Sequence, residues 1–126
     1  MLVSTVHIIE DGPRRLTVNL VGIGDGNGDE SNVVKVDVST LSPPADRLRV
    51  ERIDYDISFG LVELLWDQDV PEPFEVLAGN DEKDYLKTGG PSNTLGLETN
   101  GNLLLSTRSF EADSSYNILL EMVKKY

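Results

Sequence analysis

The sequence predicts a single all-β domain, an antiparallel β-sandwich of the jelly-roll-like kind with seven or eight strands and long loops. Three observations lead to this prediction. Apolar and polar residues alternate with a period of two in several short segments, which is typical of half-buried strands. Turn signals rich in Gly, Pro and Asn separate these segments at short intervals. A chain of 126 residues with 39% hydrophobic residues fits one domain, residues 1–126, with one core.

The alternation predicts the strands of the first half of the chain. Residues 1–10 are apolar enough to form an extended strand of the domain or an arm that grips a partner. Residues 16–20 and 34–38 place alternate apolar side chains on one face, with Lys35 on the face toward water. In residues 48–57 the alternation slips at Glu51–Arg52, and a β-bulge at that point would restore it.

The second half contains four further candidate strands. Residues 61–66 form a continuous apolar run, residues 74–77 follow two prolines that keep their start out of a central position, and residues 103–107 form another strand. Residues 116–123 fit a strand or a helix, and consistency with the rest of the chain favours the strand. Asn100–Gly101 is the strongest hairpin signal, and residues 79–96, with a turn signal at Asn80–Asp84, predict a long loop.

Composition excludes several classes of function. The chain holds 11 Lys and Arg against 22 Asp and Glu, a net charge of −11 that disfavours nucleic-acid binding. It contains no cysteine and a single histidine, His7, which removes thiolate metal sites and most catalytic triads. No apolar run approaches the length of a membrane helix, and Met1–Asp11 does not fit a signal peptide.

One glycine-rich turn carries oxygen ligands at alternate positions. Asp25, Asn27 and Asp29 match the opening of an EF-hand calcium loop. Glu30 and Val36 then stand where that loop requires Gly and Glu. We therefore interpret the segment as a turn with solvated acids and keep these three residues as weak metal candidates only.

No motif nominates a catalytic group or a cofactor site, so we do not predict an enzyme or a cofactor. Asp54 and Asp56 lie two apart on one strand face, but with Arg52 they fit the wet side of that strand. Trp66 could stack on a sugar, although a lone tryptophan in a sandwich is more often part of the core.

Two regions are candidates for contact with a partner protein. The apolar N-terminal segment is one, with an ordinary edge strand as its alternative. The acidic segment from Asp67 to Asp84 is the other, with a solubilising rim as its alternative. The loop Asn80–Gly96 is a further contact candidate, and the residues selected from all of these regions are Val3, Val6, Ile8, Asp81, Asp84 and Tyr85.

Several segments, taken in order, resemble a known group of proteins. They include ESNVVKVDV at Glu30–Val38, VELLWD at Val62–Asp67 and YNILLE at Tyr116–Glu121. Over roughly Val18–Tyr126 the chain resembles small virion structural proteins of tailed bacteriophages. The resemblance implies a β-rich fold and a place in the particle, and it supplies no catalytic residues.

Within a phage particle, the resemblance favours a decoration (cement) protein on the outside of the head, made in the host cytoplasm. Its partners would be the major capsid protein or other virion proteins, without nucleic acid or membrane. Such proteins are usually homo-oligomers, often trimers. A head-to-tail connector, collar or tail component is the first alternative. A carbohydrate-binding β-sandwich, with Trp66 and Tyr55 or Tyr85 at the site, is the second.

Overall fold

The computed structural model describes residues 3–26, 28–68, 71, 73–85 and 99–125. This part of the chain forms nine strands and one short 3₁₀ helix, η1 at Val38–Thr40. The strands are β1 Val3–Asp11, β2 Arg15–Ile23, β3 Val33–Val36, β4 Arg47–Ile57, β5 Leu61–Gln68, β6 Pro73–Leu77, β7 Asn80–Asp84, β8 Thr99–Arg108 and β9 Ser115–Lys125.

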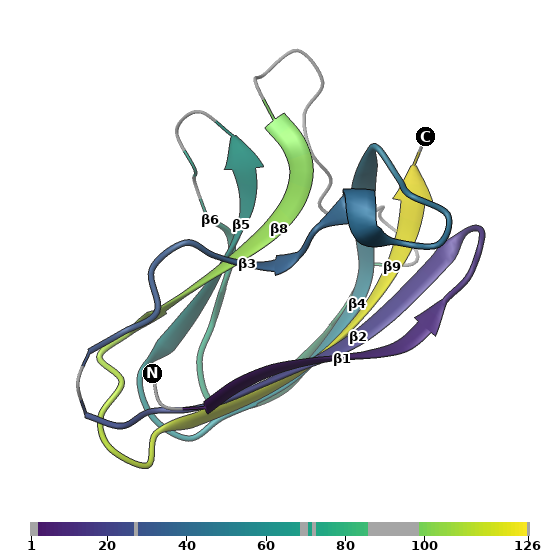
Figure 1. Ribbon diagram of the computed structural model, residues 1–126. Coiled ribbons are helices and arrows are strands. Elements are labelled where there is room, and N and C mark those ends of the chain that lie inside the picture. The colour runs from purple at the N-terminus through teal and green to yellow at the C-terminus, as the bar shows by residue number, and fades with distance from the viewer. Residues whose placement is uncertain (1–2, 27, 69–70, 72, 86–98, 126) are drawn as a thin grey trace.

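The strands form two layers that face each other across the core (Figure 1). A five-stranded sheet has the order β1-β2-β9-β4-β7, and a four-stranded sheet has the order β3-β8-β5-β6. Every paired strand runs antiparallel to its neighbour. The predicted antiparallel β-sandwich is therefore confirmed, with one strand more than the seven or eight expected.

The core lies between the sheets and follows the predicted alternation in β2 and β9. Leu16, Val18 and Leu20 are fully buried, and the intervening residues of β2 are only partly buried. The same pattern continues in β9, which pairs with β2 on one side and β4 on the other. The strand interpretation of residues 116–123 is thus confirmed over the helical one.

The bulge predicted in β4 is present. The register of β4 against β9 shifts between Val50 and Arg52, which leaves Glu51 as the extra residue. Val50 and Ile53 can therefore both face the core, and both are fully buried.

The prediction for residues 34–38 is wrong for the extent of the strand and for the faces of Val34 and Lys35, whereas Val36 and Val38 are buried as predicted. The strand ends at Val36, and Asp37 then caps η1 by accepting a hydrogen bond from the Ser39 N–H. The register of β3 against β8 shifts between Val34 and Val36, so Lys35 is buried and Val34 is exposed. A bulge and a buried partner for Lys35 override the simple alternation.

Two turn predictions are also wrong. Asn80–Asp84 is the edge strand β7, paired with β4, and its charged residues carry no apolar alternation that could have revealed it. Asn100–Gly101 lies inside β8 instead of in a hairpin turn. Gly101 has a φ of +80° and passes so close to the Asp46 backbone that a Cβ atom would collide with it. The rest of the predicted long loop, from residue 86 onward, lies outside the described residues.

The described residues include no helix with the length and apolar character needed to cross a membrane.

Candidate functional site: the exposed edge of strand β1

The two sheets present four edge strands, and β1 differs from the other three. Strand β3 has four residues and β6 has five, beginning with Pro73. Strand β7 also has five residues, and all except Asn80 are charged. Short length, proline and charge are the means by which proteins protect sheet edges from pairing with other chains. Strand β1 has nine residues, without proline or lysine, and is the one long edge among the strands that the structure describes.

The middle of β1 exposes apolar side chains. Val6 lies opposite Leu20 and Ile8 opposite Val18, two core residues of β2. Because directly opposed residues lie on the same face of a sheet, Val6 and Ile8 point to the core side of the five-stranded sheet. They are nevertheless 36% and 56% exposed, and Ile9, at a bulge in β1, is 61% exposed. On its core side, the five-stranded sheet therefore extends past the buried core, and this extension carries the exposed apolar side chains of β1.

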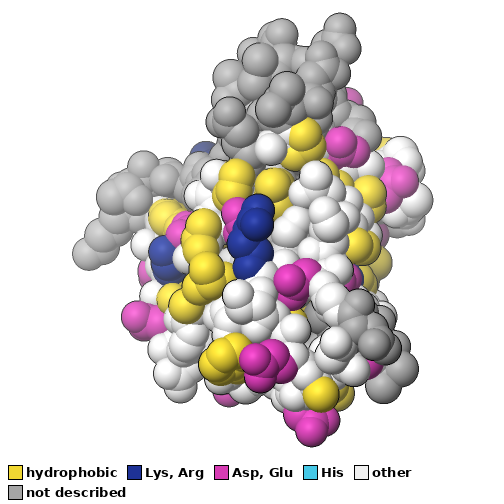
Figure 2. Space-filling model, turned by 90° about the vertical axis from the view of Figure 1, so that its left-hand side faces the viewer, with side chains coloured by type: hydrophobic (Ala, Val, Ile, Leu, Met, Phe, Trp, Pro, Cys, Tyr) yellow, Lys and Arg dark blue, Asp and Glu magenta, His cyan; other side chains and the backbone are white. Residues whose placement is uncertain are grey.

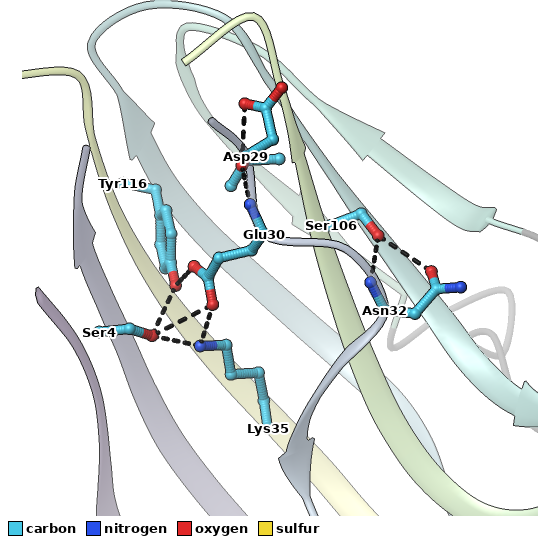
Figure 3. Close-up of polar contacts among 8 residues, drawn as sticks. Ser4, Asp29, Glu30, Asn32, Lys35, Ser106 and Tyr116 are labelled. Atoms are coloured by element: carbon cyan, nitrogen blue, oxygen red, sulfur yellow. Dashed lines mark hydrogen bonds and ion pairs between the residues drawn. The ribbon is translucent and has the colours of Figure 1, made fainter. Parts of the chain in front are cut away.

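A buried polar cluster fixes one end of β1 (Figure 3). The Lys35 ammonium lies 2.7 Å from the Glu30 carboxylate and also donates to the Ser4 hydroxyl of β1. The Tyr116 hydroxyl, on β9, donates to the other Glu30 oxygen at 2.6 Å and lies 3.2 Å from Ser4 Oγ. The cluster therefore connects β1 and β9 of one sheet with β3 of the other.

Main-chain contacts hold the Glu30 segment in place. The Glu30 N–H donates to Thr107 Oγ1 at 2.9 Å, and the Thr107 N–H donates to the Glu30 carbonyl at 3.0 Å. Burial, together with the hydrogen bond to the Glu30 carboxylate, raises the pKa of the Tyr116 phenol. Tyr116 therefore stays protonated and remains a hydrogen-bond donor throughout the physiological pH range.

A second buried lysine fixes the other end of β1. The Lys124 side chain has no solvent exposure and donates to the Asp11 carboxylate and to the Pro43 carbonyl. The Ser42 N–H also donates to Asp11, at 2.9 Å. Burial opposes ionisation of Asp11, but the bonds from Lys124 and Ser42 outweigh it and lower the pKa of this carboxyl group. Strand β1 is thus held at both ends, while its centre is exposed.

The acidic candidates lie at the opposite edge of the five-stranded sheet. Asp54 and Asp56 of β4 line a shallow groove with Asp81 and Glu82 of β7. Arg52 forms ion pairs with Asp54 and Glu82, so two of the carboxylates that line this groove are paired with a cation. This arrangement matches the predicted wet face of β4. On the face drawn in Figure 2, acidic side chains are likewise scattered among hydrophobic and uncharged polar ones.

Three side chains connect β7 and its C-terminal end to the other sheet. Glu75 of β6 accepts from Lys83 and from the Tyr85 hydroxyl. Burial, followed by the contact with Glu75, raises the pKa of Tyr85. Asp81 and Asp84 of the same strand are exposed. The structure therefore places the partner candidates at two opposite edges: Val3, Val6 and Ile8 at one, and Asp81, Asp84 and Tyr85 at the other.

The weak metal candidates do not form a described cluster. The Asp29 carboxylate accepts hydrogen bonds from Thr107 Oγ1 and from the N–H groups of Ser109 and Phe110, so it holds the end of β8. Asn27 lies outside the described residues. Among the residues with described positions, no three His, Asp or Glu side chains are grouped to hold a metal ion.

The remaining candidates take the structural roles that the sequence favoured. Trp66 is 6% exposed and stacks on Phe74, with ring centroids 4.4 Å apart, so neither ring face of Trp66 is open to a sugar. His7 is an exposed residue in the middle of β1. The buried roles of Lys35 and Lys124 were not predicted. The available signal is a lysine interrupting an apolar run, as in Val34–Lys35–Val36.

Comparisons with protein-family models, with curated proteins and with solved structures found no match for this chain.

Proposed function

We propose that this protein is a structural assembly protein, and in particular a capsid decoration protein on the head of a tailed bacteriophage. The observation that carries the proposal is the long, uncharged centre of edge strand β1, with Val6, Ile8 and Ile9 exposed. An added strand gains affinity from main-chain hydrogen bonds, and exposed alternate side chains supply specificity. The virion location is supported by the sequence resemblance alone.

The geometry favours assembly because β1 is already fixed in its extended form. Lys35 holds Ser4 at one end, and Lys124 holds Asp11 at the other. A partner that pairs with β1 therefore does not have to order this strand, and the entropic cost of binding is reduced. The acidic groove around Asp54 and Asp81 offers a separate surface for a second, basic neighbour.

The copy number in purified virions tests the proposed location. Quantitative mass spectrometry should find hundreds of copies per particle, because a decoration protein repeats with the symmetry of the shell. About a dozen copies would instead identify a connector, collar or tail component. Absence from virions would overturn both structural assignments.

Binding to heads that lack the protein tests the assembly edge. Ile8→Lys replaces an exposed apolar side chain of β1 with a charged one, and we expect it to lose binding. Val76→Lys is the matched control, because Val76 is a similarly exposed apolar residue on edge strand β6. Equal binding by both variants would overturn the assignment of β1.

A further inference from the structure

We propose that the neighbour on the β1 edge is a second copy of this chain, paired antiparallel about a two-fold axis at His7. The inference rests on β1 being the assembly edge of the proposed function, but it does not depend on the location in a virion. Closed two-fold symmetry is the commonest arrangement of soluble homo-oligomers. The pairing would join the two five-stranded sheets into one continuous sheet.

The faces of the sheet restrict the register. Opposed residues of an antiparallel pair lie on the same face, so Val6 and Ile8 must face core-side residues of the second copy. The two-fold axis must therefore pass through a residue, such as Val6, His7 or Ile8. An axis between two residues would shift the pairing by one residue and oppose side chains that lie on different faces.

The apolar side chains select among these registers. Centring on His7 places Val6 opposite Ile8 of the second copy twice, once on each side of the axis, within the part of β1 that precedes the bulge at Ile9. Centring on Val6 would place Ile8 opposite Ser4, which is already bonded to Lys35. Centring on Ile8 would place Val6 opposite the segment beyond the bulge at Ile9 of the second copy, where the faces of β1 are reversed. Of these three registers, only the one centred on His7 places both Val6 and Ile8 opposite an exposed apolar residue.

Charge favours this antiparallel pairing despite the net charge of the chain. Residues 4–9 carry no Asp, Glu, Lys or Arg, so two copies can approach along this segment. A parallel pair would place Glu10 beside Glu10, and like charges in opposed positions are destabilising.

A single introduced cysteine tests the register, because the chain contains no other thiol. In the His7 register the two residues at position 7 oppose each other, with Cα atoms about 4.5–5.5 Å apart, within disulfide reach. Residues at position 5 of the two copies are four positions out of register, about 13 Å apart. His7→Cys should therefore form a disulfide-linked dimer on mild oxidation.

Thr5→Cys is the matched control, because Thr5 and His7 are both exposed and lie two apart on the same face of β1. We expect it to stay monomeric on a denaturing gel without reductant. Cross-linking of Thr5→Cys as efficient as that of His7→Cys would overturn the register. A wild-type chain that sediments as a monomer at all concentrations would overturn the pairing itself.

The outcomes separate this inference from the proposed function. A monomeric chain that is present in hundreds of copies per virion would overturn the self-pairing and leave the decoration function intact. A chain that forms a dimer with the His7 register but is absent from virions would overturn the decoration function and leave the self-pairing intact.

Discussion

The Glu30 carboxylate lies 2.7 Å from the Lys35 ammonium, and the two side chains are only 5% and 4% exposed. Tyr116 and Ser4 complete the hydrogen bonding of this pair. Two charges removed from water stabilise a fold only while each compensates the other. Lys35 lies at the register shift of β3, between Val34 and Val36.

We expect Lys35→Met to lower the free energy of unfolding by about 3–5 kcal/mol, because it leaves the Glu30 carboxylate buried without its cation. Denaturant unfolding measures the change. Lys125→Met is the control, because it removes a lysine that is only partly buried. The double variant Glu30→Gln/Lys35→Met should be more stable than Lys35→Met alone. Additive losses in the double variant would show that the two charges do not compensate each other.

Gly22→Ala should destabilise the fold by about 1–3 kcal/mol. A Cβ atom at position 22 would overlap the ring and hydroxyl of Tyr116, which is 1% exposed and has no free space to rotate into. The ring must shift away from Glu30 and weaken the polar cluster. Combining Gly22→Ala with Tyr116→Leu should remove most of the cost of the alanine. A full additional loss in the double variant would contradict this mechanism.

Asp11 should contribute to acid stability. Its pKa is lowered in the folded state, chiefly by the bonds from Lys124 and Ser42, which outweigh the opposing effect of burial. Its stabilising effect is therefore complete above the unfolded pKa, about 3.9, and is lost as the pH falls through the lower folded value. Asp11→Asn should reduce the slope of unfolding free energy against pH below about pH 4. Asp56→Asn, at an exposed carboxylate, is the control, and an equal change in slope there would contradict the assignment.

Gly101→Ala should cost about 3 kcal/mol or more, since it combines a strained φ with a collision. The φ of +80° disfavours any side chain, and a Cβ atom would overlap the Asp46 carbonyl. Gly79→Ala isolates the first effect, because Gly79 has a φ of +70° with open space around it. We expect that variant to lose only about 1–2 kcal/mol. Equal losses in thermal unfolding would mean that the Asp46 contact adds nothing.

The fold was predictable wherever a strand has one solvent-exposed face and one buried face. In β2, Leu16 and Val18 alternate with partly exposed polar residues, and in β4 the slip at Glu51 shows the bulge directly. Strand β7 could not be predicted, because an edge strand such as Asn80–Asp84 is stabilised by backbone pairing and has no apolar face. The hairpin predicted at Asn100–Gly101 was wrong because Gly101 has its positive φ inside a strand. There the glycine allows the close approach of the Asp46 backbone.

The candidate site was predictable in part. The apolar residues Val6 and Ile8 identified the N-terminal strand as a contact surface, and the structure shows both exposed at a sheet edge. The two lysines that fix this strand could not be identified, because their partners lie far away in the sequence. Lys124 meets Asp11 across 113 residues, and only the pairing of β2 with β9 brings them together.

The central place of β9 affects how the domain is made. Strand β9 follows all other described strands in the chain, yet it lies between β2 and β4 and pairs with both along most of its length. During synthesis, the five-stranded sheet therefore stays divided until Ser115–Lys125 leaves the ribosome. The β1–β2 hairpin must wait in the cell with its apolar face unprotected, which makes this interval the period of greatest exposure to aggregation and to chaperones.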